Sequence, residues 1–240
     1  MMMYKQMSHL CKLALALSLL GVLAGCRNDG IETRKEPAKI AAVQLSPLEV
    51  EMLQVAARGD NARVKELLDK GVDVNMRGND RNTPIMEASY GGHFETVKLL
   101  LDHGADLSAK KNDGADPGGL AHGKEVIELI KNVSILVDAA ARGNTQTLNE
   151  LIGKGTPVNG LDKFGHSALT EASWSGKTDV VKLLLEKGAN PNIKKSDGQT
   201  PLSLAEGQKH ADIVKLLNEA IARQAKGATM PAAKGTPAKS

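Results

Sequence analysis

The chain has 240 residues, enough for one domain or two small ones. Aromatic residues make up only 2% of it. This argues against a domain built around one large core and suits a thin, continuous core of Ala, Leu and Val between helices. The formal net charge of +3 argues against a nucleic-acid partner, because binding a polyanion favours a strongly basic face.

The beginning of the chain has the pattern of a secretory signal. Lys5 and Lys12 give a positively charged start, and an apolar run, LALALSLLGVLA, fills positions 13–24. A run of this length suits the core of a signal peptide and is too short to span a bilayer as a helix.

The apolar run ends in Leu23-Ala24-Gly25-Cys26, which resembles the lipobox of bacterial lipoproteins. The resemblance implies removal of a signal peptide, residues 1–25, and a covalent lipid on Cys26, which anchors the protein in the bacterial envelope facing the periplasm. Arg27 is not the acidic residue associated with inner-membrane retention, so the resemblance favours the outer membrane. A secretory signal with a chance cysteine is the alternative. Cys11 lies in the removed segment, so no disulfide is expected in the mature chain.

Residues 26–45 would carry the lipid and a polar stretch without hydrophobic period, which predicts a flexible tether. Ser46-Pro47 then has the pattern of a helix N-cap followed by a proline in the first turn.

One stretch of the chain recurs. Residues 83–114 return 84 positions later, at 167–198. Within the stretch, Thr83-Pro84 opens a short apolar helix that ends at Gly91-Gly92. A second helix, 95–102, is predicted to bury Val97, Leu100 and Leu101 and to end at Gly104. The stretch has an inner period, since Thr200-Pro201 follows Ser167-Ala168 by 33 positions. One helix pair of this size cannot bury its apolar face alone, so we expect stacked pairs.

The segments TPIMEASYGGHFETVKLLLDHGADL, TEASWSGKTDVVKLLLEKGANPN and DGQTPLSLAEGQKHADIVKLL resemble the ankyrin repeat. The resemblance implies an all-α repeat solenoid of about six stacked helix-turn-helix units with short β-turn loops over residues 46–223. The units fall at 47–75, 79–108, 112–132, 133–159, 163–192 and 196–223, and the first three and last three look like an internal duplication. The tail, 224–240, is of low complexity and is predicted to be disordered.

The third unit is degenerate, because its first helix is reduced to Pro117-Gly118-Gly119-Leu120-Ala121. Each glycine inside a helix costs about 1 kcal/mol relative to alanine, so a short or irregular helix is expected here. It is either a notch or hinge for a partner or the result of drift in one repeat.

No motif in the sequence supports catalysis. Gly176-Lys177-Thr178 matches the end of a phosphate-binding loop, but the glycine needed at 171 is Glu171. Glu87 and Glu171 recur at equivalent positions of different units, too distant in a stack to act as a pair. No histidine has a partner at metal-ligand spacing, and His93 and His210 are expected to brace loops. We therefore expect no enzyme, no metal and no cofactor besides the lipid on Cys26.

In the family, partners are held by loop tips and exposed residues of the first helices, which implies a binding surface here. The corresponding residues are Asn79, Asp80, Arg81, Glu87, Tyr90, Lys163, Phe164, His166, Glu171, Trp174, Ser196 and Asp197. Trp174 and Phe164 are the strongest candidates, since aromatic residues are rare in this chain and often anchor interfaces. The alternative is that each ring packs on the neighbouring unit.

The expected function is non-catalytic binding of a periplasmic protein by a membrane-anchored monomer that does not bind nucleic acid. Two alternatives are an immunity or inhibitor protein that neutralises an envelope-acting toxin or enzyme, and a scaffold that supports a periplasmic enzyme. A purely structural role is the third.

Overall fold

The computed structural model describes residues 44–226. The predictions for the signal peptide, for lipidation of Cys26, and for most of the tether and the tail lie outside these residues. The described part of the chain contains eleven α-helices and one isolated β-bridge, between Asp106 and Leu161. The prediction of an all-α repeat fold is confirmed. Between residues 44 and 226, no helix is both long and apolar enough to cross a membrane.

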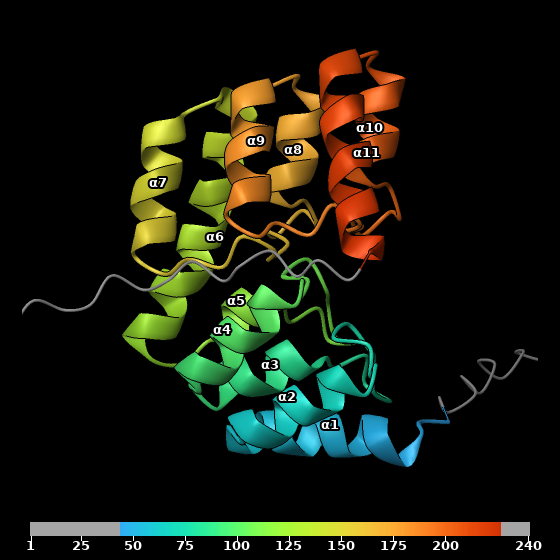
Figure 1. The fold of residues 1–240 in the computed structure, drawn as a ribbon. Coiled ribbons are helices and arrows are strands. Elements are labelled where there is room, and N and C mark those ends of the chain that lie inside the picture. Colours follow the sequence, from blue (N-terminus) through green and yellow to red (C-terminus); the bar gives the residue numbers. More distant parts are fainter. Residues whose placement is uncertain (1–43, 227–240) are drawn as a thin grey trace, which may run out of the picture. The chain divides into compact units, whose positions relative to one another are not determined.

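The helices form pairs that stack on one another (Figure 1). Their bounds are α1 Pro47–Arg58, α2 Asn61–Asp69, α3 Pro84–Tyr90, α4 Phe94–Asp102, α5 Pro117–Leu120, α6 Lys124–Arg142, α7 Thr145–Gly153, α8 Ala168–Trp174, α9 Thr178–Glu186, α10 Pro201–Gly207 and α11 Ala211–Ala225. The first helices of the units pack in the orders α1–α3–α5 and α6–α8–α10, and the second helices in the orders α2–α4–α6 and α7–α9–α11.

Helix α6 packs against α4 as a second helix and against α8 as a first helix, so it belongs to two units (Figure 1). The predicted boundary between the third and fourth units, at 132/133, lies inside one continuous helix of 19 residues. The sequence KEVIELIKNVSILVDAAAR contains no glycine or proline that would end a helix there. The second helix of unit 3 and the first helix of unit 4 are thus fused.

Two hydrophobic clusters form the core, one in each half of the repeat domain. The first includes Val97, Leu100 and Leu101, which are fully buried as predicted, and extends to Val133 of α6. The second begins shortly after it, at Leu136 of the same helix, and extends to Ala220. We call the parts before and after the middle of α6 the N-terminal half and the C-terminal half.

The loops that follow the second helices of units 2 and 4 contact each other directly, because the fused helix leaves unit 3 without such a loop. Leu107 N donates to Leu161 O at 3.1 Å, and Leu161 N donates to Ala105 O at 3.0 Å. The Asn159 side chain adds a hydrogen bond from Nδ2 to Asp102 O at 3.0 Å. These bonds join the loops of the two halves into one layer.

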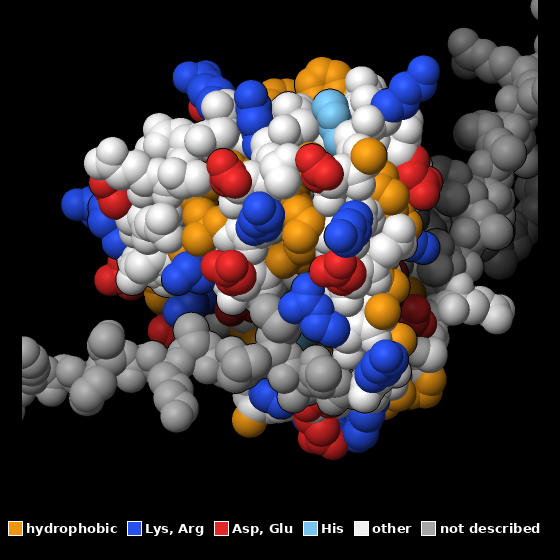
Figure 2. Space-filling view, turned by 45° about the horizontal axis from the view of Figure 1, so that its top comes forward, with side chains coloured by type: hydrophobic (Ala, Val, Ile, Leu, Met, Phe, Trp, Pro, Cys, Tyr) orange, Lys and Arg blue, Asp and Glu red, His pale blue; other side chains and the backbone are white. Residues whose placement is uncertain are grey.

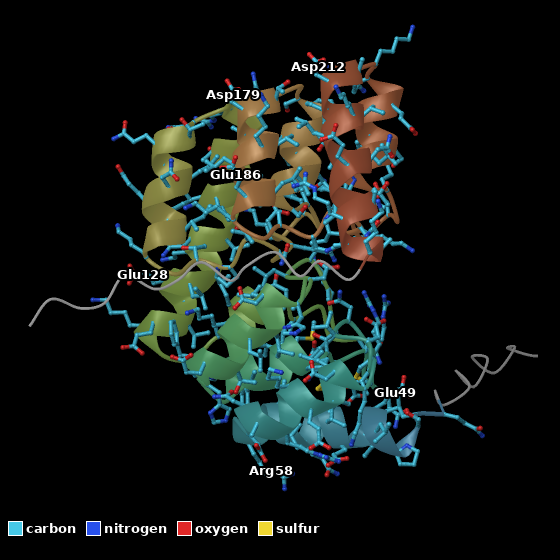
Figure 3. The ribbon with its side chains drawn as sticks, in the orientation of Figure 1. Glu49, Arg58, Glu128, Asp179, Glu186 and Asp212 are labelled. Atoms are coloured by element: carbon cyan, nitrogen blue, oxygen red, sulfur yellow. The ribbon has the colours of Figure 1, made fainter. Side chains whose placement is uncertain are left out.

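The helix ends follow local sequence signals. Ser46 caps α1 as predicted, in a reciprocal capping box with Glu49, and the Ser46 backbone N–H lowers the pKa of the Glu49 carboxyl. Figure 3 shows Glu49 and Arg58 at opposite ends of α1, where their charges complement the helix dipole. Helix α5 is only four residues long, as expected for unit 3. Helix α11 ends at Ala225, so the predicted tail boundary at 223/224 lies too early.

Charged side chains of both signs are interspersed on the face of the molecule shown in Figure 2. Surfaces of this kind are solvated and carry no single-sign field. Charge therefore does not single out any part of this face.

Candidate functional site

A surface groove of ≈ 380 Å³ lies between α8 and α10 and the loops that precede them. It is lined by His166, Glu171, Trp174, Lys195, Gln199, Ser203, Leu204, Gly207 and Gln208. Three of these, His166, Glu171 and Trp174, were predicted as binding residues from the sequence. We call this hollow the Trp174 groove.

The Trp174 groove is open because units 5 and 6 differ at two equivalent positions. Leu204 and Gly207 occupy in unit 6 the positions that Glu171 and Trp174 occupy in unit 5. A Cβ atom built on Gly207 would meet no atom within 4 Å, so the space beside the indole is vacant. The glycine of one unit thereby makes room next to the tryptophan of the preceding one.

Trp174 is the last residue of α8, and 51% of its surface is exposed. Its carbonyl accepts a hydrogen bond from His210 Nε2 at 3.2 Å, which ties the end of α8 to the next unit. His93 donates in the same way from Nε2 to Ala57 O at 2.9 Å. The bracing role expected for His93 and His210 is confirmed. The hydrogen bond from His210 fixes the backbone of Trp174.

Glu171 lies one turn before Trp174 on α8, so the two side chains share one face of the helix. His166 Nδ1 is 3.0 Å from Glu171 Oε1, and the side chains are 33% and 16% exposed. The loop positions the imidazole through Asp162, whose Oδ1 accepts from His166 N at 2.9 Å. The carboxylate is thus held at the groove wall, partly shielded from water.

Phe164, on the loop before α8, is 66% exposed and does not line the groove itself. Its ring centroid is 6.3 Å from that of His166, and Lys163 Nζ lies 5.0 Å from the Phe164 centroid. Phe164 N donates to the same Asp162 Oδ1 at 2.9 Å. One buried aspartate therefore fixes the backbone of both Phe164 and His166, and His166 lines the groove.

The N-terminal half repeats this arrangement with different side chains. Asn82, Glu87 and Tyr90 occupy the positions equivalent to His166, Glu171 and Trp174. Asn82 Nδ2 donates to Glu87 Oε1 at 2.6 Å, and Tyr90 is 63% exposed. The rings of Tyr90 and His122 form an edge-to-face pair with centroids 5.0 Å apart, and Tyr90 O accepts from His122 Nδ1 at 2.7 Å.

The tip of the first loop is polar and exposed along Asn79, Asp80 and Arg81. Asp80 occupies the position equivalent to Phe164, and its carbonyl accepts from Asn112 N at 3.1 Å. Arg81 adopts a left-handed conformation, with φ of 60°. This loop presents charge where the equivalent loop of the C-terminal half presents a phenyl ring.

Two predicted residues of the last loop take part in contacts within the chain. Ser196 Oγ donates to Asp106 Oδ2 at 2.9 Å and also lies 2.9 Å from Ser108 Oγ, so its hydroxyl joins the loops of the two halves. Asp197 accepts from Gln199 N at 3.0 Å, and this backbone N–H, with Lys195 nearby, lowers the pKa of the carboxyl.

The structure therefore gathers three of the predicted residues, His166, Glu171 and Trp174, around one hollow, and the Phe164 ring lies beside His166 outside its wall. It places Glu87 and Tyr90 in the other half. Sequence reasoning missed the other six lining residues, which are Lys195, Gln199, Ser203, Leu204, Gly207 and Gln208. Lys195 and Gln199 lie one repeat period after Asp162 and His166, so the repeat alignment could have identified them.

Among residues 44–226, no group of three or more His, Cys, Asp or Glu side chains is placed to hold a metal ion. Compared with known families, the chain matches a model described as ankyrin repeats (3 copies) over residues 18–132 and 136–226. A search of curated proteins gave no match.

Proposed function

Because the chain belongs to the ankyrin-repeat family, we propose that it is a non-catalytic binding module whose partner protein docks in the Trp174 groove. The observation that carries the proposal is the exposed indole of Trp174 in the wall of a hollow, with a second exposed aromatic side chain, Phe164, beside His166 of the same wall. Large aromatic residues anchor protein interfaces when they enter or border pockets. Single exposed apolar residues are common on protein surfaces. In a chain with only 2% aromatic residues, however, two exposed aromatic side chains in one unit indicate a binding surface.

The rigidity of the backbone around the groove supports the same proposal. His210 braces the end of α8, and Asp162 holds the loop that carries Phe164 and His166. A preformed site loses less conformational entropy on binding than a mobile one, so more of the contact energy appears as affinity.

We further propose that the module is tethered to the bacterial envelope by a lipid on Cys26, facing the periplasm. The support is the lipobox-like sequence at 23–26 after a short apolar run. In cells, wild-type protein should fractionate with membranes and should carry an acylated N-terminal peptide by mass spectrometry. Cys26→Ser should release the protein from the membrane fraction. Unmodified Cys26 in the wild-type peptide would contradict the proposal.

The binding proposal is tested by crosslinking in cells followed by identification of the captured proteins. Wild type should capture one dominant protein, and the double variant Phe164→Ala/Trp174→Ala should not. Tyr90→Ala is the matched control, because Tyr90 is the equivalent exposed aromatic residue of the other half, and it should capture as wild type does. Equal capture by a folded double variant would reject the groove as the docking site.

The identity of the captured protein would separate the functional classes. A secreted toxin or a hydrolase that loses activity in the complex would indicate an inhibitor. An enzyme that loses activity when this chain is absent would indicate a scaffold.

A further inference from the structure

We propose that the Trp174 groove accepts an arginine side chain of the partner, with the guanidinium stacked on the indole and hydrogen-bonded to Glu171. This inference rests on the proposed function and specifies its chemistry. It follows from the placement of an exposed indole, a carboxylate on the same helix face, and an opening across from them.

The carboxylate has capacity for a ligand. Within residues 44–226, the polar contact of the Glu171 carboxylate is the one between its Oε1 and His166 Nδ1, at 3.0 Å. The second oxygen, Oε2, can therefore accept from a donor that enters the groove. A carboxylate with a 16% exposed side chain is poorly hydrated, so a charged donor gains more there than on the open surface.

The charges around the groove favour a cation. Lys195 Nζ is directed to neighbours in its own loop, 3.3 Å from Asp197 Oδ2 and 3.4 Å from Gln199 Oε1. Lys195 and Asp197 balance each other, and within residues 44–226 Glu171 forms no ion pair with a lysine or an arginine. An anionic side chain would instead meet this carboxylate without a compensating cation of its own.

The indole and the amides favour arginine over other cations. A guanidinium is planar and weakly hydrated, so it stacks on an aromatic face and still offers N–H donors at its edge. The side-chain oxygens of Gln199 and Gln208, which also line the groove, supply further acceptors for such a fork. A lysine ammonium would reach Glu171 but could not stack.

The one tryptophan of the chain provides the test, because its indole N–H gives a single side-chain signal in a proton–nitrogen NMR spectrum. Three peptides of the form acetyl-Gly-Gly-X-Gly-Gly-amide are titrated into the folded protein, with X as arginine, citrulline or glutamate. Citrulline keeps the shape of arginine and lacks its charge. Arginine should shift the indole signal saturably and bind about tenfold more tightly than citrulline, and glutamate should bind less tightly still.

Two variants assign the effect to the carboxylate. Glu171→Gln should reduce arginine binding to the level of citrulline. Glu87→Gln, the equivalent change in the N-terminal half, should leave the titration of the Trp174 signal unchanged. Both variants should keep the remaining spectrum of the wild type, which establishes that they are folded.

Equal binding of arginine and citrulline, or no saturable shift with any peptide, would overturn the arginine proposal. Either result could coexist with partner capture that depends on Phe164 and Trp174, in which case the groove binds a protein by other chemistry. Loss of that dependence would reject the proposed function itself, so the two failures are distinguishable.

Discussion

The two halves of the repeat domain carry the same positions with different chemistry. The C-terminal half presents Phe164, His166 and Trp174, while the N-terminal half presents Asp80, Asn82 and Tyr90 at the equivalent positions. Both sets lie on loops and helix ends of the same kind, above separate buried clusters. The two halves share one kind of scaffold, and the exposed side chains make one half a candidate binding site and the other its internal control.

The halves also differ in how their last unit is built. Helix α10 of unit 6 has seven residues, whereas its counterpart α5 has four and contains Gly118 and Gly119. Unit 3 therefore offers a smaller first helix to its neighbour, and its second helix continues into unit 4 as α6. The halves are consequently joined through one helix as well as through the loop layer.

The largest expected effects are losses of stability from leucine-to-alanine substitutions in the core. They test whether α6 makes the two halves unfold together. Leu100 and Leu184 occupy equivalent positions, and both are fully buried. Leu100→Ala and Leu184→Ala should each lower the free energy of unfolding by about 3 kcal/mol, by lost burial plus a cavity. Urea denaturation should show one cooperative transition for both variants. Two separated transitions in either variant would mean that α6 does not couple the halves.

The next effect concerns the groove. Gly207→Leu should fill the space beside Trp174 and weaken partner binding by about tenfold or more, since the anchoring position is blocked. Gly153→Leu is the control, because Gly153 also ends a helix and also has no atom within 4 Å of a built Cβ. Neither change should lower the midpoint of thermal unfolding, since leucine favours a helix over glycine. Undiminished binding by Gly207→Leu would place the interface elsewhere.

A third expected effect is a difference in stability between variants of the two equivalent N-cap residues, Ser167 of α8 and Thr83 of α3. Ser167 caps α8 in a reciprocal box with Thr170, whereas Thr83 Oγ1, the equivalent group, is buried without a hydrogen-bond partner. Met86 stands where Thr170 stands and cannot complete the box. Ser167→Ala should cost about 1–2 kcal/mol of unfolding free energy. Thr83→Val should be neutral or stabilising, because it removes an unsatisfied hydroxyl. A comparable loss of stability in both would contradict this assignment.

The smallest expected effect concerns the side chain beside Glu171 in the C-terminal half. His166→Asn installs the residue of the other half, where Asn82 Nδ2 donates to Glu87 Oε1 at 2.6 Å. Because the carboxylate keeps a hydrogen-bond donor beside it, binding of the arginine peptide should change by no more than about threefold. A loss as large as that expected for Glu171→Gln would contradict the assigned role of Glu171, since it would place the interaction on His166.

The repeat fold could be predicted from the sequence because its signals are local. Gly91-Gly92 and Gly104 mark the ends of helices close to where α3 and α4 end. The fusion in α6 was not predicted, because the repeat period implied a boundary at 132/133 where the residues themselves supply no helix breaker. Period and local propensity disagreed there, and local propensity determined the structure.

The candidate site could be predicted only in part. Trp174 and Phe164 stood out because aromatic residues are rare in the chain. The groove depends on Gly207, whose lack of a side chain matters only because Trp174 lies beside it in the neighbouring unit. The engagement of Ser196 with Asp106 likewise joins loops that are far apart in the sequence. Contacts of this kind are tertiary, and the exposure of a loop residue alone did not reveal them.

The most direct test of the account is site-specific photocrosslinking in cells from position 199, on the groove wall, and from position 115, its equivalent in the N-terminal half. If the partner docks in the Trp174 groove, a photoreactive residue in place of Gln199 should capture it, and one in place of Ala115 should not. Capture from 115 alone, or equally from both positions, would contradict the assignment of binding to the C-terminal half.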